Sequence, residues 1–227
     1  MSEITTYYGL LRRAHETLRP RRYLEIGVHE GHSLSFVQPE TRAVGVDPEP
    51  KVEQPPDNIT IVAATSDDFF ADPTLVDLLG GPIDLAFVDG LHLHEQTLRD
   101  VANVERNADP DGIILVHDCL PIDARTAARD RKTVVWSGDV WKVVVALRRH
   151  RPDLTVTTVD VAPTGLAIIS GLDPTNSLLH DDYDAIVEEL AGLEYDDLEA
   201  VGRDAMLGVI PGDWARVEPL LAGSPTR

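Results

Sequence analysis

Short apolar runs alternate with longer amphipathic stretches along most of the chain. Residues 6–19 place apolar side chains at helical spacing, which predicts a helix that ends at Pro20. Apolar runs downstream predict seven strands, at 23–28, 43–47, 59–63, 83–89, 112–117, 154–160 and 165–170. Most of the intervals between them are long enough for helices, at 31–38, 73–80, 93–107 and 139–150. This alternation favours an α/β fold.

The same pattern indicates how the strands are arranged. The runs at 85–88 and 113–116 are continuously apolar, so both faces of these strands are expected to be buried, as in a parallel sheet. The last two strands are separated by residues 161–164 only, and four residues cannot hold a crossover helix. We therefore predict a doubly wound sheet of seven mostly parallel strands that ends in an antiparallel hairpin.

Charge and the predicted elements together divide the chain into three segments. With 39 acidic and 20 basic residues the net charge is −19, which argues against a nucleic-acid partner because phosphate binding needs a basic face. We interpret 1–20 as an N-terminal helix, 21–171 as the sheet domain and 172–227 as an acidic helical extension. A solvated surface is the simpler interpretation of the extension, and a lid or homodimer arm that meets the basic N-terminus is the alternative.

The cysteine content and the hydropathy of the chain indicate in which cellular compartment the protein is expected. Cys119 is the single cysteine, which excludes an intramolecular disulfide and favours a reducing cytoplasm. No apolar run approaches the roughly 18 residues of a membrane helix, and the N-terminus has no basic stretch followed by an apolar one, as a secretory signal would. We expect a cytoplasmic protein without a membrane partner.

The turn after the first strand is the first candidate binding site. Glu25 lies in the apolar run, and Gly27 and Gly31 then break it with the spacing Gly-x-x-x-Gly. A strand that enters a glycine turn and then a helix is how open α/β sheets bind nucleotide-like ligands, because glycine lets a ligand approach the backbone. Asp47 ends the second strand about 20 residues later, where an acid can accept both ribose hydroxyls; a helix cap is the alternative.

A second group of candidates lies at the ends of the fourth and fifth strands. Asp89 and Asp118 are expected at one rim of the sheet, where two carboxylates suit Mg²⁺. Such an ion would lower the pKa of a substrate hydroxyl. Without a metal, His92 or His117 can act as general base.

Three neighbouring features receive simpler interpretations. Asp100 is expected on the following helix as a surface or helix-pairing residue, and Asp139 is expected to cap the helix near 139–150. Residues 121–137 form a long loop with four basic side chains. It is either a lid on the substrate side or a solvated loop.

These motifs together resemble a class I S-adenosylmethionine-dependent methyltransferase over about residues 21–171. The segments Asp-Gly-Leu-His-Leu-His-Glu at 89–95 and His-Asp at 117–118 are similar to a bacterial group of small-molecule methyltransferases, with His94 where tyrosine is usual. In metal-assisted relatives a third ligand follows the second aspartate, and here that position is Cys119.

The resemblance implies S-adenosylmethionine as cofactor. Its amino-acid part would lie on the first turn, and its adenine near the loop after the third strand, where Ser66 or Asp67 would contact it. A cap for the following helix is the alternative interpretation of these two residues. The implied cofactor-binding residues are Glu25, Gly27, Gly31, Ser33, Asp47, Ser66, Asp67 and Asp89.

We therefore expect transfer of a methyl group to a small molecule, at a hydroxyl oxygen. One alternative is an NAD(P)-dependent oxidoreductase, although Gly-x-Gly-x-x-Gly is absent. The other is a partner subunit that binds the cofactor without catalysis.

Overall fold

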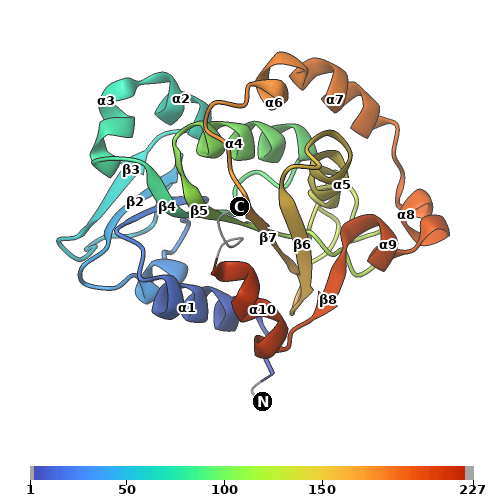
Figure 1. Ribbon diagram of the computed structural model, residues 1–227, viewed down its shortest axis with the longest axis horizontal. Coiled ribbons are helices and arrows are strands. Elements are labelled where there is room, and N and C mark those ends of the chain that lie inside the picture. The colour runs from blue at the N-terminus through green and yellow to red at the C-terminus, as the bar shows by residue number, and fades with distance from the viewer. Residues whose placement is uncertain (1–2, 223–227) are drawn as a thin grey trace.

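The chain folds around a single mixed sheet. The computed structural model describes residues 3–222, so the first two positions of the N-terminal helix segment and the last five of the extension lie outside the described residues. Within them the strands follow the order β3-β2-β1-β4-β5-β7-β6-β8 (Figure 1). Their bounds are β1 Arg22–Ile26, β2 Arg42–Asp47, β3 Ile59–Ala63, β4 Ile83–Val88, β5 Ala108–His117, β6 Thr155–Asp160, β7 Leu166–Ser170 and β8 Val209–Pro211.

The strand pairing confirms the predicted sheet in all but one respect. β3, β2, β1, β4 and β5 are parallel neighbours, and β7 is antiparallel to both β5 and β6. The described residues contain eight strands rather than seven, because β8 pairs in parallel with β6 at the far edge. This strand is three residues long, too short to show a periodic pattern.

Helices cover both faces of the sheet. Helix α1 (Tyr7–Leu18) and α10 (Trp214–Leu221) lie on one face, and Leu10, Leu11 and Val217 share one buried cluster there (Figure 1). The other face carries the helices α2 Ser66–Ala71, α3 Pro73–Val76, α4 His94–Arg106, α5 Trp141–His150, α6 Leu178–Asp181, α7 Tyr183–Ala191, α8 Tyr195–Val201 and α9 Arg203–Leu207. Successive strand residues alternate between the two clusters, as period-two side chains must.

Two predicted helices are shorter than expected. The interval 31–38 contains only a 3₁₀ helix, η1 (Ser33–Phe36), and 73–80 contains α3 followed by η2 (Asp77–Leu79). Ser35 Oγ donates to the carbonyl of His32 at 2.6 Å, a local bond that competes with helix formation. The helix predicted at 31–38 is therefore only a short 3₁₀ helix.

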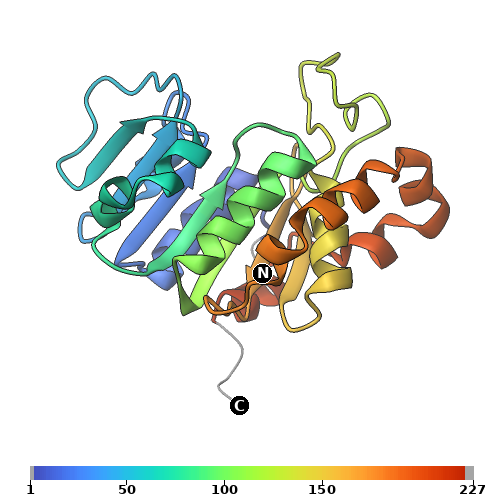
Figure 2. The same cartoon turned by 90° about the horizontal axis from the view of Figure 1, so that it is seen from above.

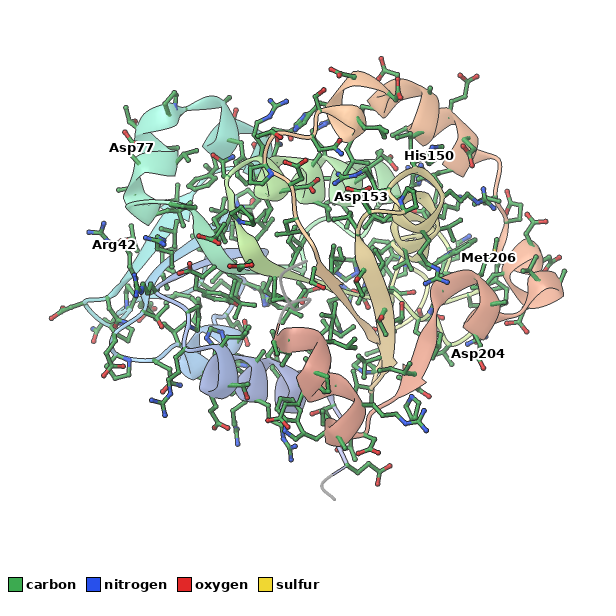
Figure 3. All side chains as sticks on the ribbon, in the orientation of Figure 1. Arg42, Asp77, His150, Asp153, Asp204 and Met206 are labelled. Carbon is green, nitrogen blue, oxygen red and sulfur yellow. The ribbon has the colours of Figure 1, made fainter. Side chains whose placement is uncertain are left out.

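The extension is helical as predicted, but it also completes the sheet. It supplies α6 to α10 and β8, and Figure 3 shows Asp204 and Met206 on the α9 side, at one end of the molecule. Within residues 3–222, no helix has both the length and the apolar character that crossing a bilayer requires.

Candidate functional site

A cavity of about 820 Å³ lies at the carboxyl ends of the central strands, the position where open α/β sheets bind ligands. Its size is in the range of small-molecule sites. Six predicted site residues on its wall come from the turns after four strands: Gly27, Asp47, Ser66, Asp67, Asp89 and His92. His117 and Asp118, at the end of β5, complete the predicted set on this wall. The cavity therefore joins both candidate regions in one space.

Gly27 has a structural role that the sequence pattern did not reveal. Its φ is +89°, and a Cβ there would lie 1.9 Å from the carbonyl oxygen of Asp89. The Gly27 amide donates to Val46 at 2.9 Å, and the Asp89 amide donates to Ile26 at 2.8 Å. Glycine at this position thus lets the ends of β1 and β4 approach each other.

Glu25 and Ser33 lie below the turn rather than on the cavity wall. Glu25 is fully buried and accepts hydrogen bonds from Tyr23 Oη at 2.7 Å and Ser33 Oγ at 2.5 Å. Burial raises the pKa of Glu25 to about 7, against the lowering effect of these two bonds. Gly31 also lies off the wall, and a Cβ there would be 2.6 Å from Val52 Cγ2. Contact of these three residues with a cofactor stays a prediction.

Asp47 and the first turn of α2 supply oxygen atoms on the other side of the turn. Asp47 accepts from the backbone amides of His29 at 2.9 Å and Glu49 at 2.8 Å, which orient its carboxylate. Gln96 Nε2 donates to Ser66 Oγ at 3.2 Å and to Asp67 Oδ1 at 3.1 Å. These bonds hold three predicted cofactor-binding residues on the wall of the cavity.

Asp100 is a correction to the sequence-based expectation. It is 1% exposed, lines the cavity and accepts from Gln96 Nε2 at 3.0 Å. Burial raises its pKa to about 6, partly offset by bonds with Ser66 and Gln96. Its i, i+4 spacing from Gln96 on one face of α4 is the signal that the sequence contained.

Two carboxylates and two imidazoles form a compact cluster at the ends of β4 and β5. His117 Nδ1 lies 3.1 Å from Asp89 Oδ1 and 3.4 Å from Asp118 Oδ2. His92 Nδ1 lies 3.0 Å from Asp118 Oδ2, and its Nε2 lies 3.5 Å from Asp89 Oδ1. Thr164 Oγ1 donates to Asp118 Oδ1. The structure thus brings together the four residues predicted at this rim.

Electrostatics within the cluster keep a proton on His117. Burial alone would lower the pKa of His117, but the carboxylates of Asp89 and Asp118 outweigh it and raise the value to about 10. The pKa of His92 is raised in the same sense, against burial, by Asp89 and Asp118. Burial would raise the pKa of Asp89, but the two imidazoles hold it well below its usual range.

Aromatic rings from distant segments cover the two histidines. Tyr7, on the first turn of α1, stacks on His117 with ring centroids 4.0 Å apart. Trp136 stacks on His92 at 5.0 Å, and the Trp136 carbonyl lies 2.9 Å from His92 Nδ1. Both aromatic residues line the cavity. Sequence reasoning missed them because neither lies near a strand end.

The loop 121–137 projects from the body of the molecule (Figure 2), and its residues Arg131, Val134, Val135 and Trp136 line the cavity. Arg129 Nη2 and Nη1 lie 2.5 and 2.9 Å from the Glu95 carboxylate oxygens, and Nη1 lies 2.8 Å from Asp139 Oδ2. Asp139 also accepts from the backbone amide and Nδ1 of His94. The expectation that Asp139 caps α5 is wrong, since α5 has no side-chain cap and Asp139 instead ties the loop to α4.

A second hollow, of about 470 Å³, lies between α5 and α9. Its Arg151 already binds Glu105 at 2.6 Å and Asp153 at 2.6 Å, near the labelled Asp153 and His150 of Figure 3. The hollow lacks the strand-end oxygens of the larger cavity, so the larger cavity is the candidate site.

Comparison with known proteins supports the sequence-based resemblance. Residues 24–119 match a family model described as a methyltransferase domain. The match confirms the resemblance to methyltransferases over less than half of the chain. No curated protein matches the sequence.

Solved structures share the fold. Cofactor-bound Rv0187 from MTB is 21% identical, with a TM-score of 0.59 over 75% of this chain and 80% of that one. The O-methyltransferase TomG from Streptomyces achromogenes, in complex with SAM, is 19% identical, with a TM-score of 0.55 over 72% and 78%. SAH-bound PaMTH1 from Podospora anserina is 20% identical, with a TM-score of 0.55 over 74% and 78%. These likenesses confirm the Rossmann-like methyltransferase fold.

Proposed function

We propose that this chain, which carries a methyltransferase domain at residues 24–119, is an S-adenosylmethionine-dependent methyltransferase that acts on a hydroxyl oxygen of a small molecule. One observation carries the proposal: a single cavity contains both the glycine turn with Asp47 and the Asp89, His92, Asp118 cluster. A methyl donor bound at the turn would therefore face an acceptor bound at the cluster. The SAM and SAH complexes among the structural neighbours point to the same donor.

The cofactor would lie along the turns after β1, β2 and β3. We assign the ribose hydroxyls to Asp47, because its carboxylate is held by two backbone amides and keeps lone pairs for further donors. The adenine would lie near Ser66 and Asp67, and the amino-acid part near Gly27 and Asp89. Glu25 supports this turn from below.

The cluster residues would align the acceptor and take its proton. When bound, S-adenosylmethionine would supply a methyl group on a sulfonium. The acceptor oxygen would form the new C–O bond as the C–S bond breaks, and the electron pair of the C–S bond would return to sulfur. His92 would be the base, because its side chain is the more exposed of the two, 24% against 8% for His117, and the pKa of His117 is raised to about 10. Its Nδ1 lies 2.9 Å from the Trp136 carbonyl and 3.0 Å from Asp118 Oδ2, and its Nε2 lies 3.5 Å from Asp89 Oδ1. Alignment of the two reactants would supply much of the rate.

A divalent ion between Asp89 and Asp118 is the second means of activating the hydroxyl. Asp89, His117 and Asp118 offer ligand atoms that all lie within 4.8 Å of one another, and the Asp118 side chain is buried. Two carboxylates with water suit Mg²⁺. The residues fit such an ion, which would polarise the acceptor oxygen.

Calorimetry with S-adenosylhomocysteine tests the proposal, with NADH and NADPH as competitors. We expect tight binding of S-adenosylhomocysteine, loss of at least about tenfold in affinity in Asp47→Ala, and no binding of the nicotinamide cofactors. The reverse preference would support the oxidoreductase. Labelled-methyl transfer measured with and without EDTA then distinguishes activation of the hydroxyl by His92 from activation by Mg²⁺, because only the ion-dependent reaction responds to the chelator.

Cofactor binding without transfer to any acceptor of a broad panel would support the non-catalytic partner subunit. A homodimer and a cytoplasmic location stay predictions from the sequence, and sedimentation of the purified chain tests the first.

A further inference from the structure

We propose that Arg131 selects an acceptor that carries a negatively charged group, which binds at the cavity mouth while the acceptor hydroxyl reaches the His92–Asp89 end. This inference rests on the proposed function and names the class of substrate for the same site. It makes Arg131 a specificity-determining residue of the loop 121–137.

Arg131 differs from the other cations near the site. Among the described residues that line the cavity, it is the only lysine or arginine. Arg99 is bound to Asp67 at 2.8 Å, and Arg129 is bound to Glu95 and Asp139. The hydrogen bond recorded for Arg131 runs from Nη2 to the carbonyl of Val134 at 3.2 Å, which leaves most of its guanidinium donors available.

The carboxylates of the cavity do not neutralise this charge, because they have other partners. Asp47 is bound by backbone amides, Asp67 by Arg99 and Gln96, and Asp100 by Gln96. Asp89 and Asp118 lie against the imidazoles of His92 and His117. An arginine fork at a cavity mouth without a carboxylate partner is a recognition site for carboxylate or phosphate.

The loop holds Arg131 in this place. On one side, Arg129 is bound to Glu95 and Asp139. On the other, Trp136 Nε1 donates to the Ala128 carbonyl at 2.6 Å and the Ser137 amide donates to Thr126 at 3.0 Å. These contacts close the segment 126–137 into a compact unit with Arg131 within it.

The walls near Arg131 indicate the body of the acceptor. Val134, 92% exposed, and Leu91, 58% exposed, line the cavity together with the half-buried rings of Tyr7 and Trp136. Apolar and aromatic walls favour a flat apolar body. The acceptor class is therefore a planar hydroxylated compound with a carboxylate or phosphate at the end away from its reacting hydroxyl.

Ligand-observed NMR on the protein saturated with S-adenosylhomocysteine tests the inference. The probes are 3- and 4-hydroxybenzoate, phenyl phosphate and the methyl esters of the two benzoates, measured on wild type, Arg131→Gln and Lys132→Gln. Lys132 is the matched control, because it is the next residue of the loop but does not line the cavity. Phenyl phosphate distinguishes recognition of phosphate from recognition of carboxylate.

We expect wild type to bind an anionic probe about fivefold more tightly than the uncharged esters, as an exposed ion pair allows. Arg131→Gln should abolish this preference, and Lys132→Gln should retain it. An equal loss in both variants, a preference that survives in Arg131→Gln, or no binding of any anionic probe would overturn the inference. Unchanged affinity for S-adenosylhomocysteine in all three proteins would show that the cofactor site is intact. If wild type did not bind S-adenosylhomocysteine at all, the proposed function itself would be overturned.

Discussion

The two halves of the cavity are built in different ways. The half proposed to bind the cofactor, here called the cofactor half, contains Gly27, Asp47, Ser66 and Asp67, which follow or end β1, β2 and β3. The half proposed to bind the acceptor, here called the acceptor half, includes Tyr7 from the first helix and Arg131 and Trp136 from a long loop. Those three lie outside residues 24–119, which match the methyltransferase domain. One wall of the cavity therefore lies within the matched domain, whereas the opposite wall combines residues of that domain with residues from outside it.

The largest test breaks the junction between the halves. Gly27→Ala would place a Cβ 1.9 Å from the Asp89 carbonyl at a φ of +89°, so β1 and β4 must separate. We expect a loss of at least about 3 kcal/mol in the free energy of unfolding, measured with urea, together with loss of S-adenosylhomocysteine binding.

Gly9→Ala is the matched control for that variant. Gly9 lies in α1, and an added Cβ would make only ordinary contact, 3.4 Å from Ile4 Cγ2. Helix propensity favours this change by up to about 1 kcal/mol. If Gly27→Ala were as stable as Gly9→Ala, the approach of β1 to β4 would not require glycine.

Glu25→Gln tests whether the cofactor half contains a buried charge. The folded-state pKa of about 7 lies above the ordinary value of 4.5. Folding therefore binds a proton between these values, and wild type loses stability as pH rises from about 4.5 to 7. The loss approaches about 3 kcal/mol by neutral pH. Glutamine keeps the shape of the side chain without the charge. At neutral pH the free energy of unfolding of Glu25→Gln should therefore exceed that of wild type by up to that amount.

Urea denaturation of both proteins at pH 5 and pH 8 measures this gain. The same difference in free energy of unfolding between the two proteins at pH 5 and at pH 8 would contradict the raised pKa. Calorimetry on the same variant addresses the cofactor: unchanged S-adenosylhomocysteine affinity supports a purely structural Glu25, and a clear loss supports its predicted contact with the cofactor.

The contrast between Glu25 and Trp136 explains how far the sequence could be interpreted. Glu25 lies within a strand-and-turn pattern whose geometry is local, so a short window predicts its neighbourhood. Trp136 reaches His92 across 44 positions through a loop without periodicity, and nothing local indicates that approach. β8 was missed for the same reason, since its three residues form a strand only because β6 offers an edge.

Arg129→Gln tests how the acceptor half is held. It removes an ion pair to the buried Asp139, whose side chain is 2% exposed, while His94 still bonds to Asp139. Because the Arg129 side chain is 46% exposed, we expect the free energy of unfolding to fall by only about 1 kcal/mol. Amide hydrogen exchange over 121–137 should accelerate about fivefold, with S-adenosylhomocysteine affinity unchanged. Arg125→Gln, on the same loop, should leave the exchange as it is; equal acceleration in both would refute the anchor.

The smallest expected effect concerns the ring of Tyr7, which tests whether the first helix belongs to the acceptor half. Burial raises the pKa of Tyr7 well above its usual value, helped by Asp89 and Asp118, so its hydroxyl stays neutral and cannot serve as a base. The stacking of its ring on His117 should therefore matter more than the hydroxyl. Tyr7→Phe keeps the ring and should bind hydroxybenzoate as wild type does. Tyr7→Leu should weaken that binding by about 1 kcal/mol and spare S-adenosylhomocysteine. If Tyr7→Phe were as impaired as Tyr7→Leu, the hydroxyl itself would contact the acceptor, and α1 would supply a polar ligand rather than an aromatic wall.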